Sequence, residues 1–99
     1  MKRDPIAGRK LLQLCGQVRD ALTTILPGCG DRVLREALVY LVEPAPNAGR
    51  LRALATVPAD GPEPGEVEAH LNRAAGMLRA EVASAIHRKR APELIFAVT

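Results

Sequence analysis

Few side chains in this sequence have the types and spacing that covalent or metal chemistry requires. Cys15 and Cys29 form no Cys-x-x-Cys pair, and neither His70 nor His87 has a cysteine at zinc-ligand spacing. Ser84 lies three residues before His87, which places both near one face of a predicted helix. A hydrolase also needs an oxyanion hole and a third group that orients the base, and the sequence indicates neither. We therefore predict a protein that is not an enzyme, with no catalytic residues, no metal site and no cofactor.

The two cysteines fall in different surroundings. Cys15 lies on the apolar side of a predicted helix, where a buried thiol is expected. Cys29 lies in the loop Pro27-Gly28-Cys29-Gly30, where it is either an incidental loop residue or an exposed, reactive thiol. We expect Gly28 and Gly30 to supply positive φ angles after the helix. A disulfide between the cysteines is not expected in a reducing cytosol.

Positive charge is concentrated in two parts of the chain. The formal net charge is +3, from 14 lysines and arginines against 11 acids. Residues 1–10 carry four bases and one acid, residues 60–70 carry four acids and no lysine or arginine, and residues 71–90 carry five bases and one acid. All but three of the bases are arginines, whose planar guanidinium groups suit contact with phosphate oxygens.

The length and composition are those of one soluble globular domain. We expect a single domain over residues 1–99, of which residues 1–8 could be flexible. Hydrophobic residues make up 47% of the chain and charged residues 25%, which argues against a disordered or disulfide-rich protein. No apolar run approaches the roughly 18 residues of a membrane-spanning helix. Lys10 and Gln13 interrupt the leucines near the N-terminus, so we predict no secretory signal and a cytoplasmic location.

The hydrophobic pattern predicts a helix followed by a β-hairpin. An apolar stripe at steps of three and four residues indicates a helix over residues 9–26, through Leu11, Cys15, Val18, Leu22 and Ile25. Residues 33–43 are rich in β-formers, although Leu34, Ala37, Leu38 and Leu41 also fit a helix. Residues 50–57 alternate, with Leu51, Ala53, Ala55 and Val57 on one face. We predict two antiparallel strands joined by a loose loop over Pro44–Gly49.

The second half of the chain predicts two helices and a last strand. A helix begins at Pro64 or Glu66, and the pattern continues past Gly76 to His87, so that the helix either tolerates this glycine or bends there. Pro92 ends it, and residues 93–99 have the apolar density of a strand. The order α-β-β-α-α-β predicts an α+β fold in which helices pack on a three-stranded sheet.

Two segments resemble the bacterial ribosome-binding factor A family. These are Leu71-Asn72-Arg73-Ala74-Ala75-Gly76-Met77-Leu78-Arg79 and Ala91-Pro92-Glu93-Leu94-Ile95-Phe96. The family has a two-layer, type II KH-like fold of the same element order, and its two middle helices meet at an Ala-x-Gly kink that Ala74, Ala75 and Gly76 match. The resemblance implies a non-enzymatic assembly factor. It would bind the immature small ribosomal subunit and its rRNA, assist late maturation including 5′-end processing, and matter most in the cold.

Arginine and lysine side chains near the kink are the candidate RNA-binding residues. Aromatic side chains are too few for a base-stacking platform, which leaves contact with phosphates and recognition of RNA shape. We predict that the rRNA footprint surrounds the kink, where Gly76 lets the RNA backbone approach. The predicted set comprises Arg73, Arg79, Arg88, Lys89 and Arg90, helped by Lys2, Arg3, Arg9 and Lys10.

Other interpretations stay open at this stage. The basic run could be an ordinary solvated surface, and Gly76 could serve only packing. The protein could be a generic KH-like RNA-binding module, or a protein-interaction domain that uses the strand face of Arg52, Leu54 and Thr56. A small α+β enzyme is a further alternative. We expect a monomer with no membrane partner and no small-molecule substrate.

Overall fold

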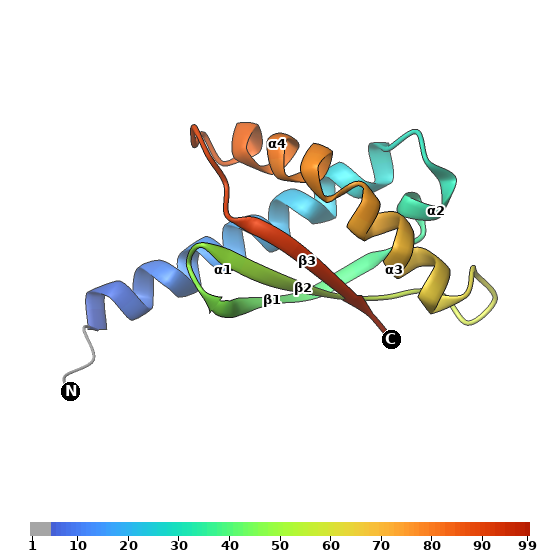
Figure 1. Cartoon of the computed structure of the whole chain (residues 1–99), viewed down its shortest axis with the longest axis horizontal. Coiled ribbons are helices and arrows are strands. Elements are labelled where there is room, and N and C mark those ends of the chain that lie inside the picture. Colours follow the sequence, from blue (N-terminus) through green and yellow to red (C-terminus); the bar gives the residue numbers. More distant parts are fainter. Residues whose placement is uncertain (1–4) are drawn as a thin grey trace.

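Three strands form one mixed sheet, and helices cover one of its faces (Figure 1). The computed structural model describes residues 5–99. In chain order the elements are α1 (Pro5–Ile25), the 3-10 turn η1 (Leu26–Gly28), α2 (Arg32–Arg35), β1 (Leu38–Asn47), β2 (Arg50–Thr56), α3 (Pro64–Arg73), α4 (Ala75–Ala85) and β3 (Glu93–Val98). The predicted two-layer α+β, KH-like fold is confirmed. Within residues 5–99, every helix is too short or too polar to cross a bilayer.

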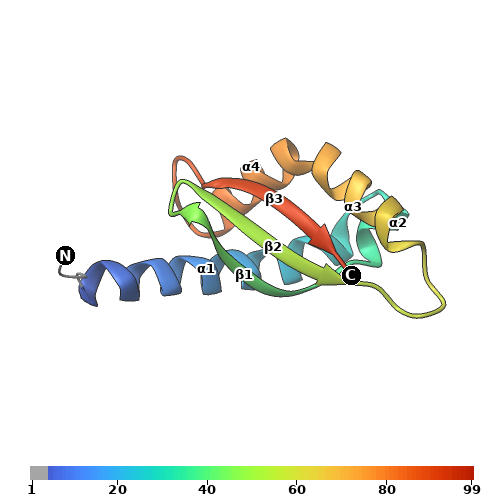
Figure 2. The same ribbon diagram turned by 60° about the horizontal axis from the view of Figure 1, so that its bottom comes forward.

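The strand order is β1-β2-β3, with β2 in the centre. β2 is antiparallel to β1 and parallel to β3, and Arg50 pairs with Glu93 at the start of the parallel ladder. A parallel pair cannot be closed by a tight turn, because the chain must return to the same end of the sheet. The helices α3 and α4 make that return over one face, and α1 covers the rest of it (Figure 2).

The core lies between this sheet face and the three long helices. Leu51, Ala53 and Ala55 of β2 are fully buried, whereas Arg50 and Arg52 point outward, so the alternation predicted for this strand is confirmed. Apolar side chains from every long helix fill the space above the sheet, among them Val18, Leu22, Val67, Leu71, Leu78 and Val82. Cys15 is buried here as predicted, and burial, reinforced by the carboxylate of Glu43, raises the pKa of its thiol.

The strand predicted over residues 33–43 is wrong in its first half. Residues 32–35 form the short helix α2, and β1 begins only at Leu38. Asp31 is the N-cap, because its Oδ1 accepts a hydrogen bond from the Val33 N–H at 2.8 Å. Leu34 of this helix is buried in the core. The alternative in which Leu34 and Ala37 have helical spacing therefore describes the start of this segment better than a strand does.

The loose loop predicted over Pro44–Gly49 is also wrong. β1 continues to Asn47, and only Ala48 and Gly49 connect it to β2. β1 is an edge strand, so prolines in it do not interrupt a ladder on both sides. Asn47 Oδ1 accepts the Gly49 N–H at 2.9 Å and closes the turn. A Cβ at Gly49 would lie 3.1 Å from that oxygen, so a glycine fits the turn best.

The end of α4 differs from the prediction as well. The helix ends at Ala85, and His87 follows with a φ of 57°, a left-handed conformation that few residues other than glycine adopt. The Arg88 N–H donates to the Ala83 carbonyl and the His87 N–H to the Ser84 carbonyl, which is a Schellman arrangement. The positive φ angles expected at Gly28 and Gly30 are absent, since no glycine in the described residues has one.

Side chains of α3 cover the outer edge of β3. Asn72 accepts the Phe96 N–H at 2.9 Å and donates to the Phe96 carbonyl at 3.1 Å. One helical turn earlier, Glu68 accepts the Val98 N–H at 2.9 Å. These bonds replace the neighbouring strand that β3 lacks, and they fix α3 along the sheet.

We predict that Asn72→Ala destabilises the fold by about 1–3 kcal/mol, because it leaves the Phe96 N–H and carbonyl without their partners. Urea denaturation would measure the change in free energy of unfolding. Gln13→Ala, at an exposed position of α1, is the control and is expected to have little effect. Equal stabilities of the two variants would show that the edge contacts do not hold α3 in place.

Candidate nucleic-acid interface

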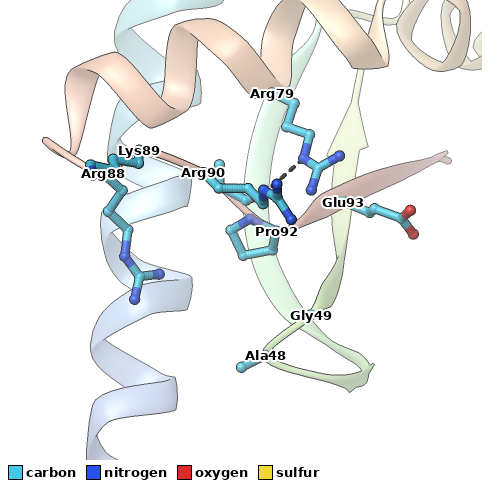
Figure 3. Close-up of a pocket in the computed structure, with 9 residues that line it drawn as sticks. Ala48, Gly49, Arg79, Arg88, Lys89, Arg90, Pro92 and Glu93 are labelled. Carbon is cyan, nitrogen blue, oxygen red and sulfur yellow. Dashed lines mark hydrogen bonds between the residues drawn. The ribbon is translucent and has the colours of Figure 1, made fainter.

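Four of the predicted RNA-binding side chains meet in one groove, which we call the basic groove. It has a volume of about 600 Å³ and lies between α4, the loop that leads to β3, and the β1–β2 turn (Figure 3). Its lining comprises Ala48, Gly49, Arg79, Arg88, Lys89, Arg90, Ala91, Pro92 and Glu93. Four cations therefore face one carboxylate, that of Glu93, across an open depression. Such a surface attracts a polyanion.

The guanidinium of Arg79 is fixed in orientation by the loop. Arg79 projects from α4, and its Nε donates a hydrogen bond to the Ala91 carbonyl at 2.8 Å (Figure 3). Its terminal Nη groups remain directed into the groove, with N–H donors suited to phosphate oxygens. The bond to Ala91 was not foreseeable from sequence, because it depends on where the loop returns.

The other three cations come from the loop itself. Arg88, Lys89 and Arg90 follow the left-handed residue His87 and are exposed. They were expected on the helix, where consecutive residues point in different directions. Because the Schellman turn ends α4 early, all three lie on one short segment at the groove instead.

The wall opposite the loop comes from a part of the chain that the sequence did not suggest. The Glu93 N–H donates to the Gly49 carbonyl at 3.0 Å, which joins the start of β3 to the hairpin turn. Ala48 and Gly49 thereby line the groove. Only the pairing of Arg50 with Glu93 could have indicated this, and the sequence left that pairing open.

The remaining predicted residues lie elsewhere. Arg73 ends α3 at the kink and does not line the basic groove. Arg9 and Lys10 are exposed on the first half of α1, and Lys2 and Arg3 lie outside the described residues. The footprint was expected to surround the kink. The groove instead extends from Arg79, one turn into α4, to the loop beyond the C-terminal end of that helix, so it lies to one side of the kink.

The predicted kink is present, and its glycine is not a packing residue. Ala74 separates α3 from α4, and the two helices meet at a bend there (Figure 1). Gly76 is exposed in the first turn of α4, and a Cβ built on it would have no neighbour within 4 Å. The alternative in which Gly76 serves only packing is therefore wrong.

A hydrogen bond ties the end of α3 to α2. His70 Nδ1 donates to Asp31 Oδ2 at 2.9 Å, while the other carboxylate oxygen of Asp31 caps α2. The bond from His70, with a smaller contribution from the Val33 N–H, lowers the pKa of Asp31 below its ordinary 3.8. The last turn of α3, which precedes the kink, is thus held by a contact with the N-cap of α2 and not by the sheet alone.

The residues with potential for chemistry are not brought together. Ser84 and His87 are both exposed at the C-terminal end of α4, and Cys29 lies beside α2, in a hollow that Met77 and Glu81 also line. Within the part of the chain that the structure describes, no three histidine, cysteine or acidic side chains are grouped to hold a metal.

Comparison with solved structures identifies the fold. Ribosome-binding factor A from Thermus thermophilus superposes with a TM-score of 0.74 at 23% identity, over 89% of this chain and 94% of that one. This chain has the fold of ribosome-binding factor A. The resemblance seen in residues 71–96 is thereby confirmed. Neither the models of known protein families nor the curated proteins contain a match to the sequence.

A second structure concerns ribosome-binding factor A in a complex. It is a homology model of the Thermus thermophilus factor, fitted into a cryo-electron-microscopy map of a complex of 30S with that factor. It matches with a TM-score of 0.66 at 25% identity, over 84% of this chain and 88% of that one.

We predict that Asp31→Asn removes an acid-dependent part of the stability. The folded-state pKa of Asp31 is lowered, so its contribution is complete above the unfolded value near 3.8 and is lost as the pH falls through the folded value. Asparagine still caps α2 but carries no charge. Denaturation midpoints should differ between variant and wild type at about pH 5 and converge at about pH 2. A difference that is constant over this range would contradict the assignment.

Proposed function

We propose that this protein is a ribosome-binding factor that binds the immature small ribosomal subunit through its rRNA. The observation that carries the proposal is the basic groove, in which four of the cations predicted from sequence meet on a ribosome-binding factor A fold. The model of Thermus thermophilus ribosome-binding factor A fitted into a map of its 30S complex supports the choice of this target over other RNAs.

In this proposal, arginine and lysine side chains hold phosphates and the protein recognises RNA shape. The chain has one tyrosine and one phenylalanine; Phe96 is buried in the core, which leaves Tyr40 on β1 as a single exposed ring where a stacking platform needs several. Base stacking on aromatic side chains, as in other RNA-binding sheets, is therefore not its mode of binding. Arg79 supplies a preoriented donor pair, and the cations of residues 88–90 add contacts along the RNA backbone.

The proposed role is to bind rather than to catalyse. By holding its rRNA segment, the protein would assist late maturation of the subunit, including 5′-end processing by other enzymes, with the greatest effect in the cold. The proposed role implies a cytoplasmic location for the protein.

We also propose that the protein is a monomer. Asn72 and Glu68 cover the outer edge of β3, and Pro44 and Pro46 lie in the edge strand β1, so neither edge favours pairing with a second copy.

We predict that the triple change Arg88→Ala, Lys89→Ala and Arg90→Ala weakens binding to small-subunit rRNA at least ~10-fold at moderate salt. The slope of log affinity against log salt should fall by about 2, because each lost phosphate contact removes roughly 0.7–0.9. Filter binding or fluorescence anisotropy over a salt series would measure both.

A matched control removes the same charge elsewhere. Arg19, Arg32 and Arg52 are exposed and do not line the basic groove, so changing these three to alanine gives the same net charge. The control is expected to lose only a small part of the affinity. If both triple variants bind equally, total charge rather than the groove decides binding, and the proposed footprint is wrong.

Gly76 provides a separate test of RNA approach at the kink. We predict that Gly76→Ala leaves the fold intact or stabilises it by about 1 kcal/mol, because the added methyl group meets open space in a helix. The larger change Gly76→Gln should also fold, yet weaken rRNA binding if the RNA backbone approaches here. Unchanged rRNA affinity in a stably folded Gly76→Gln variant would restrict the footprint to the basic groove.

One observation favours a second candidate function, that of a protein-interaction domain. On the uncovered face of the sheet, Leu41, Leu54 and Ala97 form an apolar row across all three strands, and Leu41 is 43% exposed. Co-sedimentation with immature small subunits distinguishes the candidates. A generic RNA-binding module would bind rRNA without preference for these particles, and a protein-interaction domain would keep its partner after loss of the groove cations.

A further inference from the structure

A second depression lies between α1 and α4, and its charge is opposite to that of the basic groove. It consists of two adjoining hollows that share Thr24 and Ile25. The hollow toward α2 has a volume of about 520 Å³ and the other about 500 Å³. We call the pair the acidic trough. α1 and α4 pack against each other on the helical side of the molecule, so the trough follows their junction (Figure 1).

The floor of the trough is apolar and adaptable. Ile25, Leu34 and Ile86 contribute aliphatic surface, and Leu34 and Ile25 continue into the core. Met77 lines the hollow beside the kink and is 48% exposed, although methionine is usually buried. Its flexible thioether side chain can fit apolar partners of different shapes. The trough therefore has the character of a groove for an apolar helix face.

The charged groups that line the trough are almost all acidic. Asp20, Asp31 and Glu81 line it, and His87 is the only basic side chain among its lining residues. Glu81 has no ion-pair partner among residues 5–99. Asp31 is held by His70.

Two arginines lie nearby and neutralise the negative charge of the trough only in part. Arg19 approaches Asp20 at 3.5 Å in a solvent-exposed pair, which contributes little. Arg35 is directed to the carbonyls of Cys29 and Gly30, at 3.1 and 3.4 Å.

The thiol of Cys29 reports the resulting electrostatic environment. Its pKa is raised, first by burial and then by the carboxylates of Asp31 and Glu81, and Arg35 offsets only part of this. The carboxylates of Asp31 and Glu81 line the same hollow as this thiol. Phosphate groups of RNA are disfavoured there, so the occupant is not the ligand of the basic groove.

We propose that the acidic trough is a docking site for a basic, amphipathic helical segment of a protein partner. Apolar side chains of that segment would pack on Ile25, Ile86 and Met77, while its lysines or arginines would approach Asp20 and Glu81. Residues 77 and 81 are one turn apart on α4 and face the trough together, whereas Arg79 faces the basic groove. A protein segment and RNA could therefore be bound on opposite sides of α4 at the same time.

A synthetic amphipathic helix with leucines on one face and lysines on the other is a suitable probe. We expect the full-length protein to bind it, with the largest amide shift changes at Ile25, Met77, Glu81 and Ile86. The same peptide with glutamate in place of lysine should bind at least ~10-fold more weakly, because its charge repels the rim. Equal binding of the two peptides, or shift changes confined to the basic groove or the sheet, would overturn the proposal.

Charge reversal in the protein tests the same site. Glu81→Lys should weaken binding of the lysine peptide at least ~10-fold, and Asp60→Lys, in an exposed loop outside the trough, should not. Circular dichroism would show that both variants fold. Glu81→Lys should retain its affinity for small-subunit rRNA, so failure of this proposal and failure of the proposed rRNA binding are distinguishable. Equal peptide binding by the two variants would contradict a role for the trough.

Cys29 gives a measurement that does not require a peptide. Its reaction with a cationic methanethiosulfonate should exceed that with an anionic one by at least ~3-fold, after normalisation to free cysteine, because the trough concentrates cations. Mass spectrometry would locate the adduct, since the other cysteine is buried. Glu81→Gln should bring the ratio toward one, and the bound lysine peptide should protect the thiol. A ratio of one in the wild type would refute the negative potential on which the proposal rests.

Discussion

The parallel pairing of β2 with β3 is the constraint on which the rest of the structure depends. Because Arg50 pairs with Glu93, β3 must begin beside the β1–β2 turn, and the chain must cross the sheet to reach that point. α3 and α4 make the crossing, and the loop after α4 returns to Gly49. The basic groove is the space left between this loop and the turn. The groove thus results from topology, and His87, which starts the loop, is the one non-glycine residue among residues 5–99 with a positive φ.

α3, the first of the two crossing helices, is held by polar contacts on two sides. At the sheet, Asn72 and Glu68 satisfy the outer edge of β3, and at α2, His70 bonds to the capping carboxylate of Asp31. α3 is therefore fixed before the chain bends at Ala74. α4 itself packs on α1 and β3, and the bond to the Ala91 carbonyl holds Arg79 beside the loop.

α4 separates two surfaces of opposite charge. Arg79 lies in the basic groove, whereas Met77 and Glu81 line the acidic trough. Positions two residues apart on a helix point about 200° apart, so one short element can present both. The net charge of +3 does not reveal this arrangement, because it adds the charges of both surfaces together.

The elements with a clear period were predictable, and those with competing patterns were not. The helical stripe of α1 and the alternation in β2 each fit one structure, and both were found. Residues 33–43 fit both a strand and a helix, and the N-cap at Asp31 decided the outcome locally. Prolines in residues 44–49 indicated a loop, yet an edge strand accommodates them because its outer side needs no ladder.

The sequence by itself determined the order of the long helices and the strands, the kink, the family resemblance and the identity of the cations, since these depend on local pattern and residue type. Only the tertiary structure decided which cations lie together. Arg79 joined residues 88–90 because the helix ended early and the loop met the hairpin turn, while Arg73 stayed at the kink. Contacts between segments that are distant in the chain depend on strand pairing and on where helices end. Neither can be predicted from the periodicity of nearby residues.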